Sequence, residues 1–324
     1  MAGENQPPTT SHQPPTTIMI TRIARKECTE MLRDGRYAWA AALVFTLLLT
    51  ALALGWKHHR EVKRQHDLAQ AETREQWLKQ PAKNPHSAAH YGIYAFKPKL
   101  LPALLDRGVD PYTGVAVWLE AHKQNEFKFR PAQDATAVQR FGELTAATAL
   151  QLLVPLLIIL LSFGAFAGER EQGTLRQLLS LGVPKTALVW GKAAGIAGAL
   201  GVLVVPAAVI GVIALALTSE NGLLGASAGR LAWMFASYLL YFGIFIGLSL
   251  AVSAWAKSAR FALVALLGFW IVNGLIAPRA VADAAKRIYP TPSAFSFQQA
   301  LDRDMQGDGH DTAEALKQRV LAQY

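Results

Sequence analysis

The chain has 324 residues, of which 52% are hydrophobic, a share that soluble proteins of this length rarely reach. The apolar residues stand in long blocks without charge, as they do in membrane helices. The net charge of +9 does not indicate nucleic-acid binding, because the lysines and arginines gather beside these blocks, where they set membrane topology. The single cysteine, Cys28, excludes an intrachain disulfide framework and argues against a cysteine-based metal site.

The amino-terminal part of the sequence divides into a tail and a helix. Residues 1–17 are rich in Pro, Thr, Gln and Ser, and this composition predicts a disordered tail. In residues 18–36 apolar and basic side chains recur at helical spacing, which predicts an amphipathic helix lying on the cytoplasmic surface of an anionic membrane. The alternative to a position on the membrane surface is a solvated helix that packs against a partner protein. The apolar face holds Ile20, Ile23, Ala24, Cys28, Met31 and Leu32, and the opposite face holds Arg22, Arg25, Lys26, Thr29 and Arg33.

Five uncharged blocks are long enough to cross the hydrocarbon core of a membrane. The first transmembrane helix is predicted at 37–56, and four more are predicted within 144–278. Pro155 and Pro206 fall inside two of these blocks, where kinks are tolerable because neighbouring helices can satisfy the freed carbonyls. The sequence therefore predicts an all-α polytopic membrane protein with five transmembrane helices. The four later blocks are Leu144–Gly168, Ala193–Ser219, Leu231–Ala256 and Phe261–Pro278.

Two polar regions are expected outside the bilayer. Residues 57–143 carry turn signals and scattered aromatic residues, and they predict a small, mostly helical extracytoplasmic domain. Its first part, 57–80, is highly charged and continues the helical pattern of the first span. Residues 279–324 predict a second extracytoplasmic segment that ends without a closing element, so a sixth span is expected to be missing by truncation.

Basic residues near the ends of the spans set the expected topology. The amino-terminal segment, the loop 168–192 and the turn at Lys257–Arg260 are basic, whereas the loop Glu220–Arg230 has one basic residue. This pattern places the amino terminus and the loop 168–192 in the cytoplasm. Lys57 and Arg60 count against it, but they belong to a long loop, where the rule is weak.

Two motifs that could carry chemistry fail on their context. Ser227 lies in a G-x-S-x-G match, but a nucleophile elbow needs a strand before the serine and a helix after it, and this match lies between two spans. His86 and His90 are four residues apart, a spacing that can turn two imidazoles toward one metal ion. No carboxylate or cysteine completes a ligand set at close spacing, so solvated histidines are predicted, with no metal site and no catalytic residue.

The predicted spans contain no Lys, Arg, Asp, Glu or His, which argues against ion-driven transport. This composition fits a pathway lined by small and polar residues. No G-x-x-x-x-G-K-[ST] motif occurs, so the chain is not expected to be an enzyme, and powered transport would need an ATPase in a separate subunit. The candidates for lining a pathway are Gln151, Ser237, Tyr241 and Asn273.

The polar loop between the second and third spans carries a family pattern. Its segments Glu169–Glu171, Gly173–Leu175, Leu178–Ser180, Pro184–Lys185 and Gly191–Lys192 resemble the cytoplasmic loop of ABC type-2 transporter permeases. The basic segment before the first span and the large outside domain also fit. The layout looks like the subgroup that includes the permease of the nitrous-oxide-reductase maturation system, and the resemblance covers nearly the whole chain from Ile18.

The resemblance implies that this loop holds a coupling helix, Leu175–Leu181, that fits a groove in an ATPase. Gly173 permits a sharp break before it, Thr174 is expected to cap it, and Gly182 and Pro184 are expected to end it. Its leucines would supply an apolar face for insertion, and the charged residues before it would form ion pairs across the interface. The residues expected to couple are Glu169, Arg170, Glu171, Gly173, Thr174, Leu175, Leu178, Leu179, Pro184 and Lys185.

By this resemblance the chain is the membrane-spanning permease subunit of an ATP-binding cassette transporter in a bacterial inner membrane. It would pair with a second permease, as a homodimer or heterodimer, and couple ATP hydrolysis to substrate export or other transmembrane transport. ATP and Mg²⁺ would bind in the partner ATPase, and this chain would hold no cofactor. The chain would lie in the lipid bilayer and would not bind nucleic acid. The alternative is a non-transporting membrane scaffold or sensor whose extracytoplasmic domain binds a partner.

Overall fold

The computed structural model describes residues 16–122, 127–134, 144–219 and 223–306, together with 315, 318 and 321. The chain forms two compact units, Met1–Trp270 and Ile271–Tyr324. Within the described ranges, five helical stretches are long and apolar enough to cross a membrane. They confirm the predicted all-α polytopic fold. The tail predicted at 1–17 lies outside the described residues, apart from its last two.

Each of the five helical stretches is longer than the uncharged block that predicted it. α10 begins at Lys185 and α11 at Leu223, so flanks that were expected to be loops are helical. The stretches are α2 (Gly35–Leu78), Ala146–Glu171, α10 (Lys185–Thr218), α11 (Leu223–Trp255) and Ala259–Ile288. Their component elements are α6 (Ala146–Thr148), η3 (Ala149–Leu153), α7 (Val154–Ser162), α8 (Ala167–Glu171), α12 (Ala259–Ile271), η4 (Val272–Ile276) and α13 (Ala277–Ile288), and α14 (Ala294–Gln306) follows in the second unit.

The first membrane helix, α2, continues far beyond its apolar part. At its amino end Asp34 acts as a cap, accepting a hydrogen bond from the N–H of Arg36 at 2.9 Å. The 44 residues of α2 span about 66 Å at 1.5 Å per residue, roughly twice the thickness of a hydrocarbon core. Its charged second half carries ion pairs one turn apart, such as Lys63–Asp67 at 3.0 Å. The first span and the first part of the predicted outside domain are therefore one continuous helix.

Two π-helical turns allow prolines inside the membrane helices. η3 lies directly before α7, whose second residue is Pro155, and η4 lies directly before α13, whose second residue is Pro278. In each case the N–H that closes the π turn reaches the carbonyl five residues earlier, so the helix widens next to a residue that cannot donate. The uncharged block ends at Pro278, but the helix passes through this residue and continues to Ile288.

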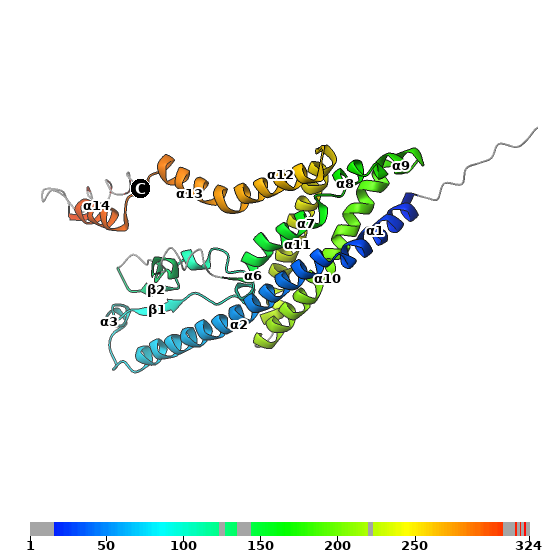
Figure 1. Ribbon diagram of the computed structural model, residues 1–324. Coiled ribbons are helices and arrows are strands. Elements are labelled where there is room, and N and C mark those ends of the chain that lie inside the picture. The colour runs from blue at the N-terminus through cyan, green and yellow to red at the C-terminus, as the bar shows by residue number, and fades with distance from the viewer. Residues whose placement is uncertain are drawn as a thin grey trace, which may run out of the picture. The chain divides into compact units, whose positions relative to one another are not determined.

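The amino-terminal helix α1 (Thr16–Arg33) packs along α10 (Figure 1). Glycines on α10 make the close approach possible. A Cβ atom on Gly191 would lie 2.6 Å from the Cβ of Ile23, and one on Gly195 would lie 2.6 Å from the Cβ of Glu27. The apolar face of α1, which the sequence predicted to lie on lipid, is thus covered by a helix of the same chain.

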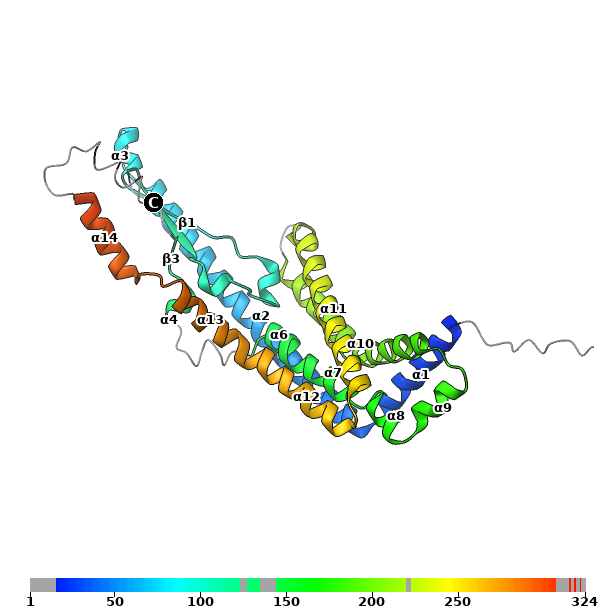
Figure 2. The same cartoon turned by 90° about the horizontal axis from the view of Figure 1, so that it is seen from above.

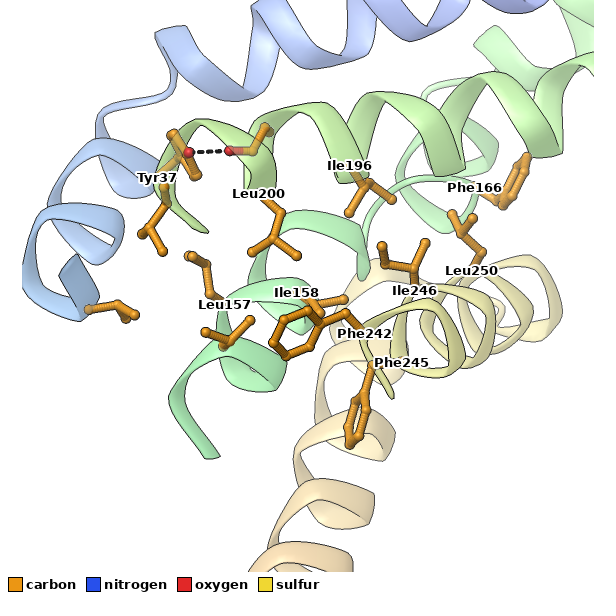
Figure 3. Close-up of a cluster of buried hydrophobic side chains, with 14 of the residues drawn as sticks. Tyr37, Leu157, Ile158, Phe166, Ile196, Leu200, Phe242, Phe245, Ile246 and Leu250 are labelled. Atoms are coloured by element: carbon orange, nitrogen blue, oxygen red, sulfur yellow. Dashed lines mark hydrogen bonds between the residues drawn. The ribbon is translucent and has the colours of Figure 1, made fainter. Parts of the chain in front are cut away.

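The main hydrophobic cluster lies where α2, α7, α10 and α11 meet (Figure 3). Val154, Ile158 and Ile196 are fully buried in it. α2 joins through Tyr37, whose hydroxyl donates to the carbonyl of Ala199 at 2.6 Å. Because the cluster collects side chains from helices that are distant in sequence, it fixes the positions of these helices relative to one another.

A small antiparallel sheet, which the sequence did not predict, organises the region after α2. Its order is β1–β2–β3, with Ile93 paired to Leu119. After β1 the chain returns to the membrane helices, where Leu104 is buried against Leu215 of α10. Helix is still the main secondary structure of the described residues within 57–143, because the second half of α2 belongs to this region. The other elements are α3 (Pro85–Ala89), β1 (Ile93–Phe96), η1 (Leu101–Leu104), η2 (Asp110–Tyr112), β2 (Ala116–Leu119), β3 (Phe127–Lys128) and α4 (Pro131–Asp134).

We expect Gly195→Ala to weaken the packing of α1 on α10, although alanine favours a helix over glycine by about 1 kcal/mol. The new methyl group would lie 2.6 Å from the Cβ of Glu27 and 3.1 Å from the carbonyl oxygen of Ala24, so the helices would have to separate. Overpacking of this kind lowers the free energy of unfolding by about 1–3 kcal/mol. The midpoint of thermal unfolding in detergent micelles is the measurement.

Gly201→Ala, on the same helix, is the matched control. A Cβ at this position meets no described atom within 4 Å, so this variant should leave the midpoint unchanged or raise it. Equal midpoints for the two variants would contradict the role of Gly195.

Candidate functional site

Seven of the ten residues predicted to couple lie in two short helices on either side of Gly173, and Pro184 and Lys185 lie at the start of α10. The two short helices are α8 (Ala167–Glu171) and α9 (Thr174–Ser180). Both lie near the start of α10 and beside α1, as Figures 1 and 2 show. The turn 163–166 separates α8 from α7. The second and third spans are thus joined by a pair of helices rather than by an irregular loop.

A serine of α11 holds the turn that separates α8 from α7. The Oγ atom of Ser253 belongs to a fully buried residue. It accepts hydrogen bonds from the N–H groups of Phe166 (3.0 Å) and Ala167 (3.1 Å), and it donates to the carbonyl of Phe163 (2.8 Å). A break in a membrane helix leaves backbone groups that need partners, and this one side chain supplies them. The direction of α8 is therefore fixed relative to α11.

A buried lysine links α8 to α10 and α1. The ammonium group of Lys192, on α10, donates to Oε1 of Glu169 at 2.8 Å and to Oε1 of Glu27, on α1, at 2.9 Å. Only 1% of Lys192 is exposed. A buried ion needs partners of opposite charge because it has lost its hydration. These three residues, which we call the Lys192 triad, therefore join three helices at one point.

A second lysine offsets the extra negative charge of the Lys192 triad. Lys26 lies 3.5 Å from Oε1 of Glu27 and 3.1 Å from Oε2 of Glu30. Burial lowers the pKa of Lys26, but the hydrogen bond to Glu30 and the charges of three nearby carboxylates outweigh it and raise the pKa above its ordinary value. Oε2 of Glu169 is buried and has no hydrogen-bond partner in the described part of the chain, so this carboxylate depends on Lys192.

The next residue, Arg170, attaches α8 to the end of α11. Its guanidinium donates to the carbonyl of Ala254 at 2.6 Å and to that of Ala256. Backbone oxygens at a helix carboxyl end lack intrahelical partners, and the helix dipole is negative there. Glu169 and Arg170 were predicted to form ion pairs across a subunit interface. Both are bonded within the chain, and Arg170 and Glu171 are the exposed charged residues of α8.

Gly173 makes the sharp turn between α8 and α9. Its φ of +78° lies in the left-handed region, which glycine enters without steric cost. Gly173 also stands at the cap position of α9, where no described side chain accepts from the free N–H groups. The predicted capping role of Thr174 is therefore wrong. This residue is already the first of the helix, and its hydroxyl donates to the carbonyl of Glu169 at 3.2 Å, which joins α9 back to α8.

The other end of α9 closes in a Schellman motif. The N–H of Gly182, at φ +79°, donates to the carbonyl of Leu179 (3.1 Å), and the N–H of Val183 donates to that of Leu178 (3.2 Å). These bonds satisfy carbonyls that a helix end would otherwise leave free. Pro184 then stands at the cap position of α10. The helix ends where the sequence predicted.

α9 turns two leucines inward and leaves two at the surface. Leu175 and Leu178 pack against the main hydrophobic cluster, whereas Leu179 is 39% and Leu181 is 75% exposed. The apolar face predicted for insertion into an ATPase is therefore divided, because residues three positions apart share the inward side. We call the exposed residues the outer surface of α9: Glu171, Arg176, Gln177, Leu179, Ser180, Leu181 and Lys185.

Two of the four residues predicted to line a pathway lie together. The hydroxyl of Tyr241 donates to the backbone carbonyl of Gln151 at 2.8 Å, and Nε2 of Gln151 donates to the hydroxyl of Tyr238 at 3.3 Å. Tyr238 donates in turn to Oδ2 of Asp106 at 3.0 Å. A carboxylate from the region after η1 thus reaches the polar side chains of the membrane helices.

The other polar residues that the sequence singled out lie elsewhere. Ser237 donates to the carbonyl of Trp233 in its own helix at 2.8 Å, and Asn273 lies in η4, in the second unit. Ser227 is buried inside α11, so it does not stand at the strand-to-helix turn that a nucleophile elbow needs.

The sequence indicated no role for Ser253 or for the side chain of Glu27, and Lys192 was predicted only as part of the family pattern and of the basic loop. A signal was present for Glu27, which is four residues from both Ile23 and Met31 and so falls on the apolar face of α1. An acidic residue on an apolar face predicts a buried partner of opposite charge. Ser253 gave no such signal, because serines are common in membrane helices.

Five apolar helical stretches, with a bonded helix pair between the second and third, define a multi-span membrane protein of the permease class. The chain belongs to the ABC-2 transporter family, because the family model described as ABC-2 family transporter protein matches residues 21–305. A comparison with curated proteins finds no match. The matched range includes most of α1, all five membrane stretches, α8 and α9. The chain is thus a membrane component of an ABC transporter, a class that works with an ATPase in an oligomeric assembly.

Replacing Lys192 with methionine should destabilise the protein by about 3–5 kcal/mol. The carboxylates of Glu27 and Glu169 would remain buried without their counterion. We expect a lower midpoint of thermal unfolding in detergent micelles at neutral pH.

The triple variant Glu27→Gln, Glu169→Gln and Lys192→Met is the matched control, because it removes all three charges together. It should recover much of the lost stability, since a buried ionic group can often be replaced as a whole by neutral residues. Wild-type stability of Lys192→Met alone would show that the Lys192 triad does not hold these helices.

Proposed function

We propose that this chain couples ATP hydrolysis in a separate ATPase subunit to transport across the membrane, and that the ATPase docks on the outer surface of α9. The observation that carries this proposal is the attachment of α8 to three helices. Glu169 reaches α10 and α1 through Lys192, and Arg170 reaches the end of α11. A displacement of α8 and α9 would therefore pass directly to these helices.

The outer surface of α9 has the chemistry of a docking site. Leu179 and Leu181 offer exposed apolar area, and Glu171, Arg176 and Lys185 add charges of both signs. Interfaces commonly combine an apolar centre with a polar rim, and a short helix with such a face fits a groove in a partner. Family membership favours an ABC ATPase as that partner.

The path from the outer surface to the spans is short and mostly buried. Thr174 bonds α9 to α8, Ser253 fixes α8 against α11, and Lys192 fixes α8 against α10. Packed and bonded groups move together, because interiors resist deformation. When two ATPase subunits close on ATP, we infer that each pair α8–α9 carries α10 and α11 with it as a rigid body.

The surrounding assembly follows from the same proposal. We place the amino terminus, α8 and α9 in the cytoplasm of a bacterial inner membrane, as the distribution of basic residues favours. Two permeases, identical or different, would each bind one ATPase, which holds ATP and Mg²⁺. The large region between the first two spans supports a place in the subgroup of the nitrous-oxide-reductase maturation permease, and we propose export as the direction.

We propose that cargo passes Gln151 and Tyr241. A mostly apolar cavity of about 160 Å³ is lined by Leu150, which precedes Gln151 in the chain, and by Tyr238, which Gln151 hydrogen-bonds; Asp106 is the one charged residue of its lining. Its lining favours an apolar chemical group over an ion as the part of the cargo that enters it.

Leu181→Asp should weaken binding of the ATPase at least about tenfold, because a charge would replace an exposed apolar side chain in the docking surface. The measurement is co-purification with the ATPase that the wild-type chain captures. Leu78→Asp is the matched control, since Leu78 is 67% exposed at the carboxyl end of α2, and this variant should retain the ATPase. Full retention by Leu181→Asp would exclude the outer surface as the docking site.

Arg170→Ala should separate docking from coupling. Because Arg170 is bonded to the end of α11, the variant should still capture the ATPase, but ATP hydrolysis by the complex should fall to the rate of the isolated ATPase. Deleting Leu175–Leu181 should abolish both capture and stimulation. Undiminished stimulation in Arg170→Ala would contradict transmission through α8.

A further inference from the structure

Three histidines of the region after α2 lie together. His86 and His90 are one turn apart at α3, and His122 follows β2. One ring nitrogen from each lies within 4.8 Å of the others. The ring centroids are 4.7 Å apart for His86 and His90, 5.1 Å for His90 and His122, and 5.9 Å for His86 and His122. We call these residues the histidine cluster. The sequence paired only the first two, because His122 is distant along the chain.

The register of the sheet brings the histidines together. β1 begins just after α3, and β2 ends just before His122. Ile93 is paired with Leu119, so the start of β1 and the end of β2 lie side by side. The N–H of Ala121 donates to the carbonyl of Ala89 at 3.0 Å, which ties the turn after β2 directly to α3. The cluster is therefore a product of the fold and not of chance contacts between loose side chains.

The local backbone supports this arrangement. Asn84 caps α3 by accepting from the N–H of Ser87 at 2.8 Å, and Pro85 occupies the first turn, where proline is favoured. His122 has a φ of +62°, in the left-handed region that few residues other than glycine adopt. Such a conformation persists where surrounding contacts impose it, and the bond between Ala121 and Ala89 is one of these contacts.

The spacing of the nitrogens suits metal coordination. In a tetrahedral zinc site with Zn–N distances of about 2.05 Å, neighbouring ligand nitrogens are about 3.3 Å apart. The Nε2 atoms of His86 and His90 are 3.3 Å apart. The nitrogen of His122 lies within 4.8 Å of the other two, and all three side chains are exposed, so their rings are free to turn toward a shared ion. Three imidazoles leave a fourth coordination position for water or another ligand.

We propose that the histidine cluster binds one divalent transition-metal ion, Zn²⁺ or Cu²⁺. Imidazole nitrogens suit these ions, whereas Mg²⁺ and Ca²⁺ require oxygen ligands. The ion would join α3 to the turn after β2 and so hold the sheet region together. None of the ligands belongs to the outer surface of α9, so this site is independent of ATPase docking.

The test is calorimetric titration of the full-length chain, purified without a polyhistidine tag, with Zn²⁺ alone and with Cu²⁺ alone. We expect one ion per chain and no binding of Mg²⁺ or Ca²⁺ at this site. His90→Gln should weaken the affinity more than about 100-fold, because loss of outer-shell groups by itself costs metal sites 10–100-fold. His86→Gln and His122→Gln should behave alike.

His58→Gln is the matched control, because it removes an exposed imidazole from α2 and should leave the affinity unchanged. With Cu²⁺, electron paramagnetic resonance should show nitrogen splitting that decreases in each cluster variant. Absence of binding by both ions, or binding that is equal in the wild type and all three cluster variants, would overturn the proposal. The 3.3 Å contact would then be a hydrogen bond between the two imidazoles.

Discussion

The packing of α1, α8 and α10 depends on the buried ammonium group of Lys192, which both Glu27 and Glu169 contact. Its charge has almost no access to water, so Glu27 and Glu169 must meet it from two other helices. Each of the three side chains therefore restricts where the other two helices can lie. Gly191 and Gly195 serve the same requirement, because they let α1 come close enough for Glu27 to reach the ammonium.

A buried ionic group contributes little net stability, because desolvation offsets most of the attraction, but it is sensitive to the relative position of its members. The Lys192 triad therefore acts mainly on geometry, by holding α8 at one register against α10. Arg170 and Ser253 restrict α8 in a second direction, toward α11. These two attachments, to α10 and to α11, fix the orientation of α8 relative to both helices.

The membrane helices were predictable because long uncharged blocks suit few other environments. The ends of these helices were not predictable from the sequence. The last of them continues past Pro278 because a π turn precedes this residue, and such a turn depends on the surrounding structure. The end of α9 was predictable from Gly182 and Pro184, but the inward side of α9 was not, because neighbouring helices decide that Leu175 is covered and Leu181 is exposed. The sheet was missed because its strands have four, four and two residues, too few to show an alternating pattern. His122 was missed for the same reason, since only strand pairing carries it to α3.

α2 has a mechanical consequence beyond its length. It is bonded to α10 at Tyr37, which donates to Ala199, and again at Trp56, whose ring N–H donates to the hydroxyl of Thr218 at 3.0 Å. The part of α2 from Trp56 to its end at Leu78 is about 33 Å long at 1.5 Å per residue, so a tilt of about 10° about Trp56 carries that end sideways by about 6 Å. Small rotations within the bundle are thus magnified into large excursions outside it. α2 is thus a lever arm. A change in its angle that is too small to detect among the packed spans would displace the sheet region, which packs on its second half, by several times more.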